Sequence, residues 1–418
     1  MKVAVIGVGR VGLPLALAFL ERGAEVVGVD INERLRESVA VDKRMPFKEP
    51  GFEALLEDPG LPMREDVRQV EAADFFIVTV GTPLLQHLET DLTAVTRAVR
   101  RLCEVLRPGN TVIMRSTTAP KTTRYVKHLI ERESGLEVGK DVYLACCPER
   151  ILEGQAREEL FRLPQIVGTE DEGSKAAADA LFARLGVERL HCDFITAELV
   201  KLFNNTSRYA YFAVANALAM IAMEYDAEPH EIMRLTNHDY PRPINAKPGL
   251  TAGTCLRKDF GMISEAYWSA DMLIQSWRIN ESLPKYLVDY VERKAGSLRG
   301  RAVAILGYTF KRDADDTRDS LAAKLIRYVL RSSPQRVTVH DPFIEAKMVA
   351  ERDEVTFTTD LEAAVRGADV VFVATNHTAY DEAQELVADA LAEGGMVVDI
   401  WNALRTGRVL ASKGTLRA

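Results

Sequence analysis

Residues 2–12 read Lys2-Val3-Ala4-Val5-Ile6-Gly7-Val8-Gly9-Arg10-Val11-Gly12. An apolar stretch with the character of a strand runs directly into a glycine-rich turn, and apolar residues at helical spacing follow as far as Gly23. A second apolar strand, residues 25–29, ends in Asp30. The order of strand, glycine turn, helix, strand and acid is typical of the first unit of an α/β domain that binds a dinucleotide.

The residues of this turn fit the physical demands of a bound pyrophosphate. Gly7 permits a tight turn, Gly9 lets the backbone approach the phosphates, and Gly12 allows the helix to pack closely against the strand. The N-terminus of the helix supplies N–H groups that face the phosphates. Asp30 stands where a carboxylate would bind the ribose 2′-hydroxyl and would repel a 2′-phosphate, which favours NAD over NADP.

Length and composition exclude several classes of protein. With 418 residues the chain is too long for one hydrophobic core, so two or three domains are expected. The net charge of −8 disfavours nucleic acid as a partner, and no apolar run reaches the roughly 18 residues that a membrane span needs. Five cysteines do not suggest a disulfide framework and no cleavable leader is recognisable, so we expect a cytoplasmic protein.

Further α/β units are expected after the first, with strands at residues 75–80, 112–114 and 142–145. Hydroxyl residues follow two of these strands, in residues 79–83 and 115–118. Parallel α/β sheets bind ligands outside the carboxyl ends of their strands, which makes both loops candidates for ligand contacts. They are equally typical of turns and helix N-caps, and the two interpretations are compatible.

The segment from Cys146 to Gly154 carries two acids, Glu149 and Glu153, four residues apart. They fit either an ordinary helix start with acidic residues in its first turn or an acid/base pair, and the sequence does not decide between them. The adjacent Cys146 and Cys147 have no His or Cys partner at zinc-ligand spacing, so no metal site is expected.

The middle of the chain follows a different pattern. Residues 196–225 contain no glycine or proline and repeat apolar residues at helical spacing, which predicts a helix about 45 Å long. Lys201 and Asn205 lie one turn apart on this helix and therefore on one face. More helix is expected at residues 229–236 and 272–295, so we predict an all-helical segment that serves as a dimerisation platform.

Between these helices we expect a loop that reads Ala252-Gly253-Thr254-Cys255-Leu256-Arg257-Lys258-Asp259-Phe260. A cysteine with small neighbours, followed closely by Lys258 and Asp259, combines a thiol nucleophile with a cation that lowers the pKa of the thiol and a carboxylate that handles protons. The same pattern also fits a packed thiol beside a solvated surface ion pair.

A second α/β set follows, with strands expected in four segments. These are residues 302–306, 337–340, 370–374 and 396–399. The set lacks the glycine pattern of the first, so we expect its strand-end crevice to hold a ligand other than a dinucleotide. Lys311 and Arg318 follow the first of these strands and are suitably placed to bind a phosphate-bearing ligand. With Asp313, Asp315 and Asp316 they also fit a surface ion-pair network.

Seven motifs occur in order along nearly the whole chain. They are Gly7, Gly9 and Gly12; Thr82-Pro83; Ser116-Thr117; Pro148-Glu149 with Glu153-Gly154; Glu198 to Asn205; Gly253 to Asp259; and Phe310 to Ser320. Together they resemble the UDP-glucose/GDP-mannose dehydrogenase family of NAD-dependent nucleotide-sugar 6-dehydrogenases. The resemblance implies an α/β fold of two Rossmann-like doubly wound domains joined by a long central helix and an all-helical middle segment. We expect an NAD-binding domain in residues 1–195, a central helical and dimerisation domain with the catalytic Cys loop in 196–297, and a nucleotide-sugar-binding domain in 298–418.

The resemblance also implies a four-electron oxidation. The C6 alcohol of a nucleotide-linked hexose becomes an aldehyde with one hydride to NAD, and a thiolate adds to the aldehyde. A second hydride leaves a thioester, which water cleaves to the uronate. A thiol is required because a thiohemiacetal can lose hydride where a free aldehyde cannot.

The functional positions of the family carry over residue by residue. The implied catalytic set is Cys255 as the nucleophile, Lys201 and Asn205 for oxyanions, and Glu149, Asp259 and Thr117 for protons or the hydrolytic water. The implied cofactor-binding set is Gly7, Gly9, Val11, Gly12, Asp30, Thr82, Pro83, Thr117 and Arg318. The implied substrate-binding set is Glu149, Arg150, Glu153, Lys201, Asn205, Arg242, Gly253 and Lys311. We expect a nucleotide-sugar substrate and a homodimer.

Two departures from the family pattern bear on the substrate. Leu250 and Ala252 carry side chains in a loop that is longer and richer in glycine in relatives, so we expect a different pocket. Arg150 after Glu149 resembles the branch that acts on N-acetylhexosamine nucleotides, and Arg242 resembles an arginine that some members place at the substrate across a dimer interface. UDP-N-acetylhexosamine and UDP-glucose both stay open as substrates, as does a deoxythymidine nucleotide.

Two other functions fit part of the sequence. A two-electron β-hydroxyacid dehydrogenase also joins a Rossmann domain to helices through a long helix that bears Lys and Asn, but it needs no cysteine and usually lacks a second nucleotide domain. A non-catalytic nucleotide-sugar sensor would be expected to lose its chemical residues. In this chain Cys255, Lys201, Asn205 and Asp259 are all present.

Overall fold

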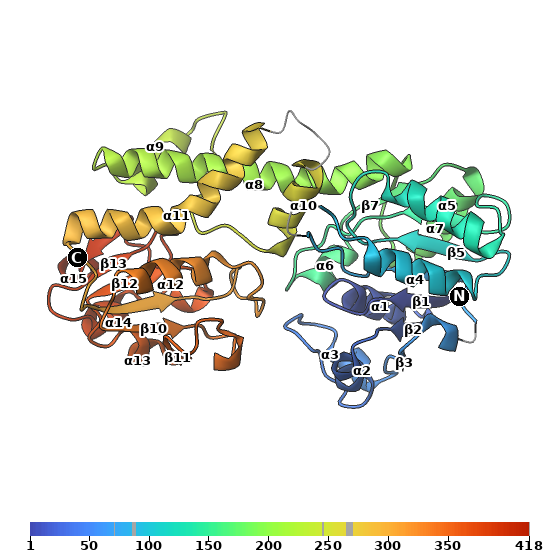
Figure 1. Cartoon of the computed structure of the whole chain (residues 1–418), viewed down its shortest axis with the longest axis horizontal. Helices are drawn as coiled ribbons and strands as arrows, with labels where there is room; N and C mark the ends of the chain where they lie inside the picture. Colours follow the sequence, from blue (N-terminus) through green and yellow to red (C-terminus); the bar gives the residue numbers. More distant parts are fainter. Residues whose placement is uncertain (71, 86–88, 245, 265–270, 418) are drawn as a thin grey trace. The chain divides into compact units, whose positions relative to one another are not determined.

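The computed structural model of the chain describes residues 1–70, 72–85, 89–244, 246–264 and 271–417. The described residues form two compact units (Figure 1), each with one sheet. Unit 1 comprises residues 1–204 and a short segment that begins at Gly261, and unit 2 comprises residues 205–260 and the C-terminal part of the chain. The predicted pair of Rossmann-like α/β domains is confirmed. The predicted domain boundaries at residues 195 and 297 stay a prediction.

Unit 1 contains an eight-stranded sheet with the order β3-β2-β1-β4-β5-β6-β7-β8. The strands are β1 (Lys2–Ile6), β2 (Glu25–Val29), β3 (Met63–Arg64), β4 (Phe75–Val78), β5 (Thr111–Met114), β6 (Tyr143–Cys146), β7 (Gln165–Gly168) and β8 (Arg189–Cys192). All neighbouring strands are parallel except β6 and β7. The central strands are buried on both faces, which explains why they read as continuous apolar runs.

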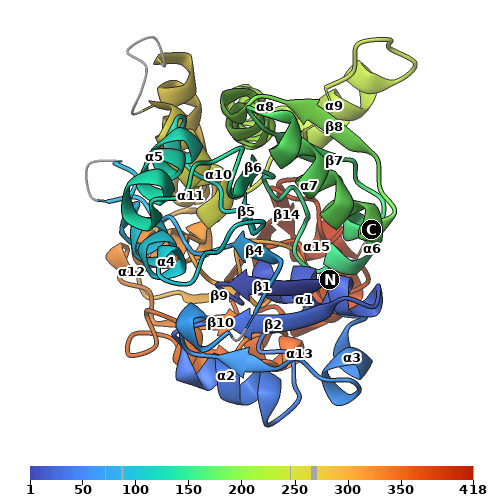
Figure 2. The ribbon, with the colours of Figure 1, turned by 90° about the vertical axis from the view of Figure 1, so that its right-hand side faces the viewer.

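Helices cover both faces of this sheet (Figure 2). They are α1 (Gly12–Glu21), α2 (Glu33–Ala40), α3 (Glu53–Glu57), α4 (Thr93–Cys103), α5 (Thr122–Ser134), α6 (Ala156–Leu160) and α7 (Glu172–Phe182). Helices α1 and α7 share a hydrophobic core on one face, and α4 and α5 share a second core on the other. This doubly wound arrangement brings the loops that follow the parallel strands to one edge of the sheet.

Helix α8 (Phe194–Glu224) has 31 residues and is the long helix predicted for residues 196–225. The boundary between the two units falls within it, after Asn204. Helices α9 (Pro229–Asn237), α10 (Thr254–Ser264) and α11 (Asp271–Ala295) follow. No helix in the described part of the chain combines the length and the apolarity that crossing a membrane requires.

The prediction of a loop around Cys255 is wrong, because this residue lies in the first turn of α10. Gly253 has a φ of +104°, a left-handed backbone that favours glycine and sets the helix apart from the segment before it. The residues after Gly253 carry neither glycine nor proline until Gly261, so nothing in their sequence opposes a helix.

Unit 2 contains a six-stranded sheet with the order β11-β10-β9-β12-β13-β14. The strands are β9 (Ala302–Leu306), β10 (Arg336–His340), β11 (Thr356–Thr358), β12 (Val370–Val373), β13 (Met396–Val398) and β14 (Leu410–Ser412). Its helices are α12 (Leu321–Arg331), α13 (Leu361–Val365), α14 (Gln384–Ala390) and α15 (Lys413–Leu416). The strands are parallel except for β14, and the first five repeat the order of β3-β2-β1-β4-β5 in unit 1.

Candidate active site

The glycine turn after β1 has the shape that a bound pyrophosphate requires. A side chain at Gly12 would lie 2.0 Å from the carbonyl oxygen of Gly7, so glycine is needed for α1 to pack against the turn. A side chain at Gly9 would meet no atom within 4 Å, so open space lies beside the turn. Val11, the N-cap of α1, forms no side-chain cap. Leu13 N donates to the carbonyl oxygen of Gly9 at 2.9 Å and Pro14 has no N–H, so the helix dipole would contribute more to the attraction of an anion here than free N–H groups would. These residues fit a dinucleotide cofactor.

Asp30 lies at the end of β2, and its side chain is partly exposed. Its Oδ2 accepts a hydrogen bond from Val8 N at 2.8 Å, and its Oδ1 accepts one from Asn32 N at 2.9 Å. The carboxylate is therefore fixed beside the glycine turn while part of its surface faces solvent. This is the placement expected of a group that binds the ribose hydroxyls of NAD.

Hydroxyl groups join the loops after β4 and β5. Buried Thr82 donates to the carbonyl oxygen of Thr117, and Ser116 Oγ donates to Val80 O at 2.8 Å. The sequence was compatible with ligand contacts and with turn formation in these loops. The hydroxyls of Thr82 and Ser116 have the second role, because they stabilise the loops through hydrogen bonds to backbone carbonyls. Pro83 is exposed and Thr117 is partly exposed, so both are accessible at the carboxyl ends of these strands.

A buried ion pair fixes Glu149. Arg115 donates from Nε to Glu149 Oε2 at 2.9 Å, and its Nη2 donates to the same oxygen. The Nη1 of Arg115 donates to Gln165 Oε1 at 2.7 Å. The other carboxylate oxygen, Oε1, accepts from the backbone N–H groups of Arg150 and Ile151. Four N–H donors thus hold the carboxylate in one orientation.

Arg115 is not among the site residues predicted from the sequence. Its side chain is 2% exposed, and its guanidinium lies 5.4 Å from the ring centroid of Phe182. The available signal was its position at the end of a buried strand, directly before Ser116 and Thr117. A charged group in such a place needs a partner, because burying an unpaired charge is strongly unfavourable.

Besides Glu149, the segment of residues 146–154 carries two charged residues, Arg150 and Glu153, whose surroundings differ. Glu153 Oε2 lies 3.8 Å from Nη1 of Arg10 in the glycine turn, which puts this acid beside the cofactor crevice. The guanidinium of Arg150 donates to the carbonyl oxygen of Pro164, and burial lowers its pKa. The predicted contacts of Glu153 and Arg150 with the substrate stay predictions.

Four cysteines are unsuited to nucleophilic chemistry. Burial raises the pKa of the Cys103 thiol to about 11. Burial likewise raises the pKa values of Cys146, Cys147 and Cys192. These thiols therefore remain protonated near neutral pH. The side chain of Cys255 lies outside the part of the chain that the structure describes, so its role as the nucleophile stays a prediction.

Glu198 fixes the start of α8 in unit 1. Its buried carboxylate accepts hydrogen bonds from Lys121 N and from both N and Oγ1 of Thr123, each at 2.7 Å. Burial raises the pKa of Glu198, and these hydrogen bonds oppose the shift. These hydrogen bonds fix the rotation of α8 about its axis. They thereby set the direction of the Lys201 side chain, which lies about one turn later and is partly exposed.

In unit 2 a buried hydrogen bond joins α8 to α10. Asn205 Nδ2 donates to Asp259 Oδ2 at 2.6 Å, and the two residues are only 6% and 1% exposed. The sequence predicted both residues for the site but not their contact, since they are 54 positions apart. A charge-assisted bond of this kind holds the carboxylate in one orientation and offsets part of the free energy of its desolvation.

The segment before α10 packs into unit 2. A side chain at Gly253 would lie 2.3 Å from Cδ2 of Phe310, so this backbone lies directly against the aromatic ring. The N–H of Gly253 donates to the carbonyl oxygen of Asp319 at 3.3 Å. Leu250 and Ala252 are buried in the hydrophobic core of the unit. Their side chains are thus used for packing, which explains why glycine is not needed at these positions.

Three basic residues of unit 2 have different degrees of exposure. Arg318 forms a two-pronged ion pair with Asp316, at 2.9 Å from Nε and 2.5 Å from Nη2, while its side chain remains 60% exposed. Arg318 therefore forms an ion pair with one of the three acids, Asp316, that the sequence suggested as partners. Lys311 is partly exposed in the loop after β9. Exposed Arg242 lies with its guanidinium 5.0 Å from the ring centroid of Tyr240.

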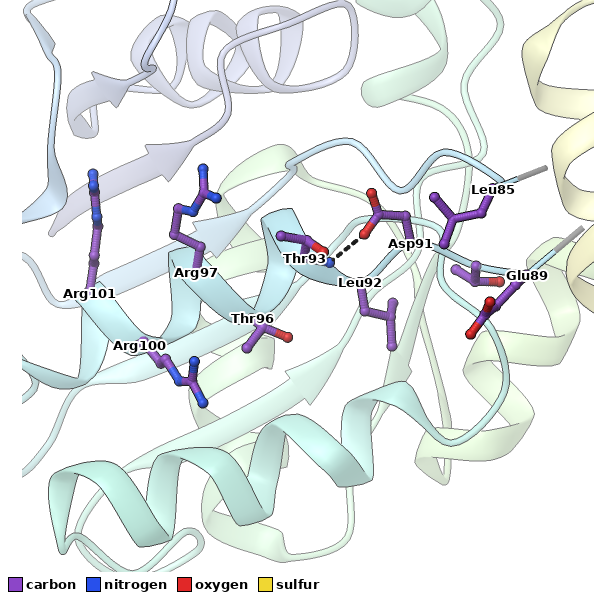
Figure 3. Close-up of a pocket in the computed structure, with 10 residues that line it drawn as sticks. Leu85, Glu89, Asp91, Leu92, Thr93, Thr96, Arg97, Arg100 and Arg101 are labelled. Carbon is purple, nitrogen blue, oxygen red and sulfur yellow. Dashed lines mark hydrogen bonds between the residues drawn. The ribbon is translucent and has the colours of Figure 1, made fainter. Parts of the chain in front are cut away.

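A cavity of about 620 Å³ lies along the start of α4 in unit 1 (Figure 3). It is lined by Leu85, Glu89, Thr90, Asp91, Leu92, Thr93, Thr96, Arg97, Arg100 and Arg101. Figure 3 shows three of these arginines along one helix and the hydrogen bond of 2.8 Å from Thr93 N to Asp91 Oδ1. The cavity shares no lining residue with the predicted site. Within the described ranges, no three His, Cys, Asp or Glu side chains gather so as to hold a metal ion.

The chain matches protein-family models over most of its length and in a consistent order. The model described as the UDP-glucose/GDP-mannose dehydrogenase family NAD binding domain matches residues 1–186. The central domain of the same family matches residues 195–282, and its UDP binding domain matches residues 304–406.

Individual relatives are similar over the same extent. The UDP-N-acetyl-D-mannosamine dehydrogenase of Pyrococcus horikoshii is 32% identical over 394 residues, which cover 90% of each chain. The NDP-N-acetyl-D-galactosaminuronic acid dehydrogenase of Ralstonia solanacearum is 30% identical and covers 96% of this chain and 97% of its own.

Solved structures share the fold. The UDP-D-ManNAc dehydrogenase of Pyrococcus horikoshii superposes with a TM-score of 0.85 at 30% identity, covering 96% of this chain and 95% of that one. The UDP-glucose dehydrogenase of Pyrobaculum islandicum gives a TM-score of 0.85 at 27% identity, covering 97% of this chain and 95% of that one.

Proposed function

Because this chain belongs to the UDP-glucose/GDP-mannose dehydrogenase family, we propose that it oxidises the C6 alcohol of a UDP-sugar to the uronate in a four-electron reaction. It is an NAD-dependent UDP-sugar dehydrogenase. The observation that carries the finer proposal is the buried bond between Asn205 and Asp259, which brings the helix motif and the cysteine motif together within unit 2. A two-electron enzyme would need neither the cysteine nor this pairing.

In the proposed mechanism NAD, when bound, accepts a hydride in each of two oxidations. The C6 alcohol first loses a proton and a hydride to give the aldehyde. The thiolate of Cys255 then adds to the aldehyde carbon, and Lys201 and Asn205 stabilise the resulting oxyanion. Loss of the second hydride leaves a thioester, and water cleaves it to release the uronate and the thiol. Asp259, Glu149 and Thr117 are the residues proposed to handle protons or to orient this water.

For the sugar we propose a UDP-N-acetylhexosamine, with the N-acetylmannosamine nucleotide as the first candidate. The relatives at 32% and 30% identity carry the name UDP-N-acetyl-D-mannosamine dehydrogenase, and the sequence around Arg150 resembles the same branch. UDP-glucose is the second candidate, since a UDP-glucose dehydrogenase shares the fold. We also propose the cytoplasm as the compartment, because Cys103, Cys146, Cys147 and Cys192 are all free thiols.

The experiment that tests the function is the yield of NADH per mole of sugar consumed. The panel comprises UDP-ManNAc, UDP-GlcNAc, UDP-glucose, UDP-galactose, GDP-mannose and dTDP-glucose. Two NADH per sugar on one member would support the four-electron reaction and identify the substrate. One NADH per sugar would favour the two-electron alternative, and binding without any NADH would favour a non-catalytic nucleotide-sugar sensor.

The cofactor role of Asp30 gives a separate prediction. Replacing Asp30 by alanine should weaken NAD binding about 10- to 100-fold, because charge-assisted hydrogen bonds to the ribose are lost. It should also reduce the preference for NAD over NADP, since the carboxylate no longer repels a 2′-phosphate. Calorimetric titration with NAD, NADP and UDP measures all three affinities. Asp42→Ala, at an exposed acid of the same unit, is the control, and an unchanged NAD affinity of Asp30→Ala would contradict the ribose role.

We further propose a homodimer that forms through α8. Four residues of this helix and Tyr225, directly after it, make an apolar seam: Tyr211, Val214, Leu218, Ile221 and Tyr225. They are 41% to 82% exposed, and their spacing alternates between three and four residues, which is the pattern of helices that pair side by side. Exposed apolar rows of this kind mark association surfaces.

A charge in this seam should therefore dissociate the dimer. We expect Ile221→Asp to shift the protein toward the monomer by at least tenfold in dissociation constant, because the carboxylate would be buried without a partner. Sedimentation equilibrium measures the shift. Val41→Asp, at an aliphatic residue that is also exposed, should leave the mass unchanged, and equal masses for the two variants would rule out the seam as the interface.

A further inference from the structure

A fully buried histidine lies at the strand ends of the second sheet, outside the sites discussed so far. His377 follows β12 and is 0% exposed. The backbone N–H of Asp313 donates to its Nδ1 at 3.0 Å, so this nitrogen must be an acceptor without a proton. The ring proton is then on Nε2, which lies 3.1 Å from Asp341 Oδ2 and 3.2 Å from Thr309 Oγ1. Both ring nitrogens are therefore used.

Asp341 connects this histidine to the turn after β9. The carboxylate, which follows β10, is 0% exposed, and its Oδ2 also accepts from the backbone N–H groups of Tyr308 and Thr309 at 2.8 and 3.0 Å. Burial alone would raise the pKa of Asp341, but hydrogen bonds from His377 and from the backbone hold it below its ordinary value. The two side chains thus form a buried, hydrogen-bonded pair that fixes the start of the loop.

The same histidine also fixes the end of the loop. Thr309 Oγ1 donates its proton to the carbonyl oxygen of Lys311 at 3.1 Å, so it accepts the hydrogen bond from His377. Asp313 has a φ of +56°, which is unfavourable for a residue with a side chain and has to be maintained by its contacts. Its carboxylate accepts hydrogen bonds from N and Oγ1 of Thr378, the residue after His377. Residues 307–313 are therefore held at both ends.

This loop carries two residues that matter for the reaction. Lys311 is the proposed contact to the nucleotide sugar, and the ring of Phe310 lies against Gly253, two positions before Cys255. We propose that His377 is a positioning residue of the nucleotide-sugar site, which holds residues 307–313 in the conformation that presents Lys311 and supports Gly253. The inference rests on the proposed function, because Lys311 has this importance only if unit 2 binds the nucleotide sugar.

The test is a set of His377 variants in the full-length protein, with UDP binding measured by calorimetry. His377→Phe removes the hydrogen bonds of both ring nitrogens, to Asp313, Asp341 and Thr309, and should weaken UDP binding about 10- to 100-fold. An asparagine at position 377 would retain a hydrogen-bond acceptor near the position of Nδ1, and a glutamine would retain a donor near the position of Nε2. His377→Asn and His377→Gln should therefore recover part of the affinity, and they also provide folded protein if the Phe variant is unstable. The KM for the nucleotide sugar should rise in parallel, while the KM for NAD stays unchanged.

His340 provides the matched control. It is a buried histidine of the same unit, 2% exposed, and its ring is hydrogen-bonded to Tyr380 Oη at 2.8 Å and to the carbonyl oxygen of Thr359 at 3.2 Å. His340→Phe should lower the melting temperature without weakening UDP binding. Equal UDP affinities of the His340 and His377 variants, or an equal rise in both KM values, would overturn the positioning role. Failure of the unaltered protein to bind UDP would instead overturn the proposed function.

Discussion

Replacing Cys255 by serine is expected to reduce uronate formation by at least about a thousandfold while NAD binding stays intact. A serine hydroxyl is far less nucleophilic than a thiolate and does not add efficiently to the aldehyde, so the adduct that loses the second hydride is not formed. The variant should release at most one NADH per sugar and accumulate aldehyde. Mass spectrometry of the products and NADH absorbance measure the two oxidations separately.

Cys192→Ser is the matched control for this substitution. Cys192 is a partly exposed free thiol, and burial raises its pKa, so it should play no part in the chemistry. We expect this variant to yield two NADH per sugar, as the unaltered protein does. Full conversion to uronate by Cys255→Ser would remove the covalent step from the mechanism and favour direct oxidation of a hydrated aldehyde.

The second large effect concerns stability. Replacing Arg115 by methionine should lower the free energy of unfolding by about 3–5 kcal/mol, because Glu149 would remain buried without its cationic partner. Gln165 would lose a hydrogen-bond donor as well. Urea unfolding followed by circular dichroism measures the change. Arg124→Met is the control, since the Arg124 side chain is 60% exposed in its pair with Glu170, and it should cost only about 0–1 kcal/mol.

A double variant separates the loss of an ion pair from the loss of packing. Arg115→Met combined with Glu149→Leu leaves no buried charge, so it should regain part of the stability that the single variant loses. Equal destabilisation by Arg115→Met and Arg124→Met would contradict the importance of this pair. No recovery in the double variant would indicate that the volume and the hydrogen bonds of Arg115 matter more than its charge.

Local features of the sequence were sufficient to predict most of the fold. The glycine turn, the acid at residue 30 and the alternation of strands and helices depend on near neighbours in the chain, so their pattern can be read directly. The helix around Cys255 was missed, because a segment between two longer helices that begins with Thr251-Ala252-Gly253 resembles a loop. Its helical character begins at Thr254, directly after the left-handed Gly253.

The contacts of the site could be predicted only in part. Arg115 meets Glu149 across 34 positions and Asp341 meets His377 across 36. The first contact depends on β5 and β6 being neighbours, and the second depends on β10 and β12 lying on either side of β9. The sequence indicates that an acid follows β10, as one follows β2. It gives no sign that this acid is hydrogen-bonded to a histidine that follows β12. Partners of this kind follow from strand order, which is a property of the folded sheet.

The two sheets share the order of five strands, and in each an acid follows the strand next to the first one. Asp30 keeps part of its surface in solvent, whereas Asp341 is completely enclosed by its own domain. Asp341 is therefore not available to the ribose of a nucleotide bound in unit 2, while Asp30 is available in unit 1. Strand order alone would suggest the same kind of nucleotide site in both units, whereas the burial of Asp341 takes from unit 2 one of the features that favour a dinucleotide in unit 1.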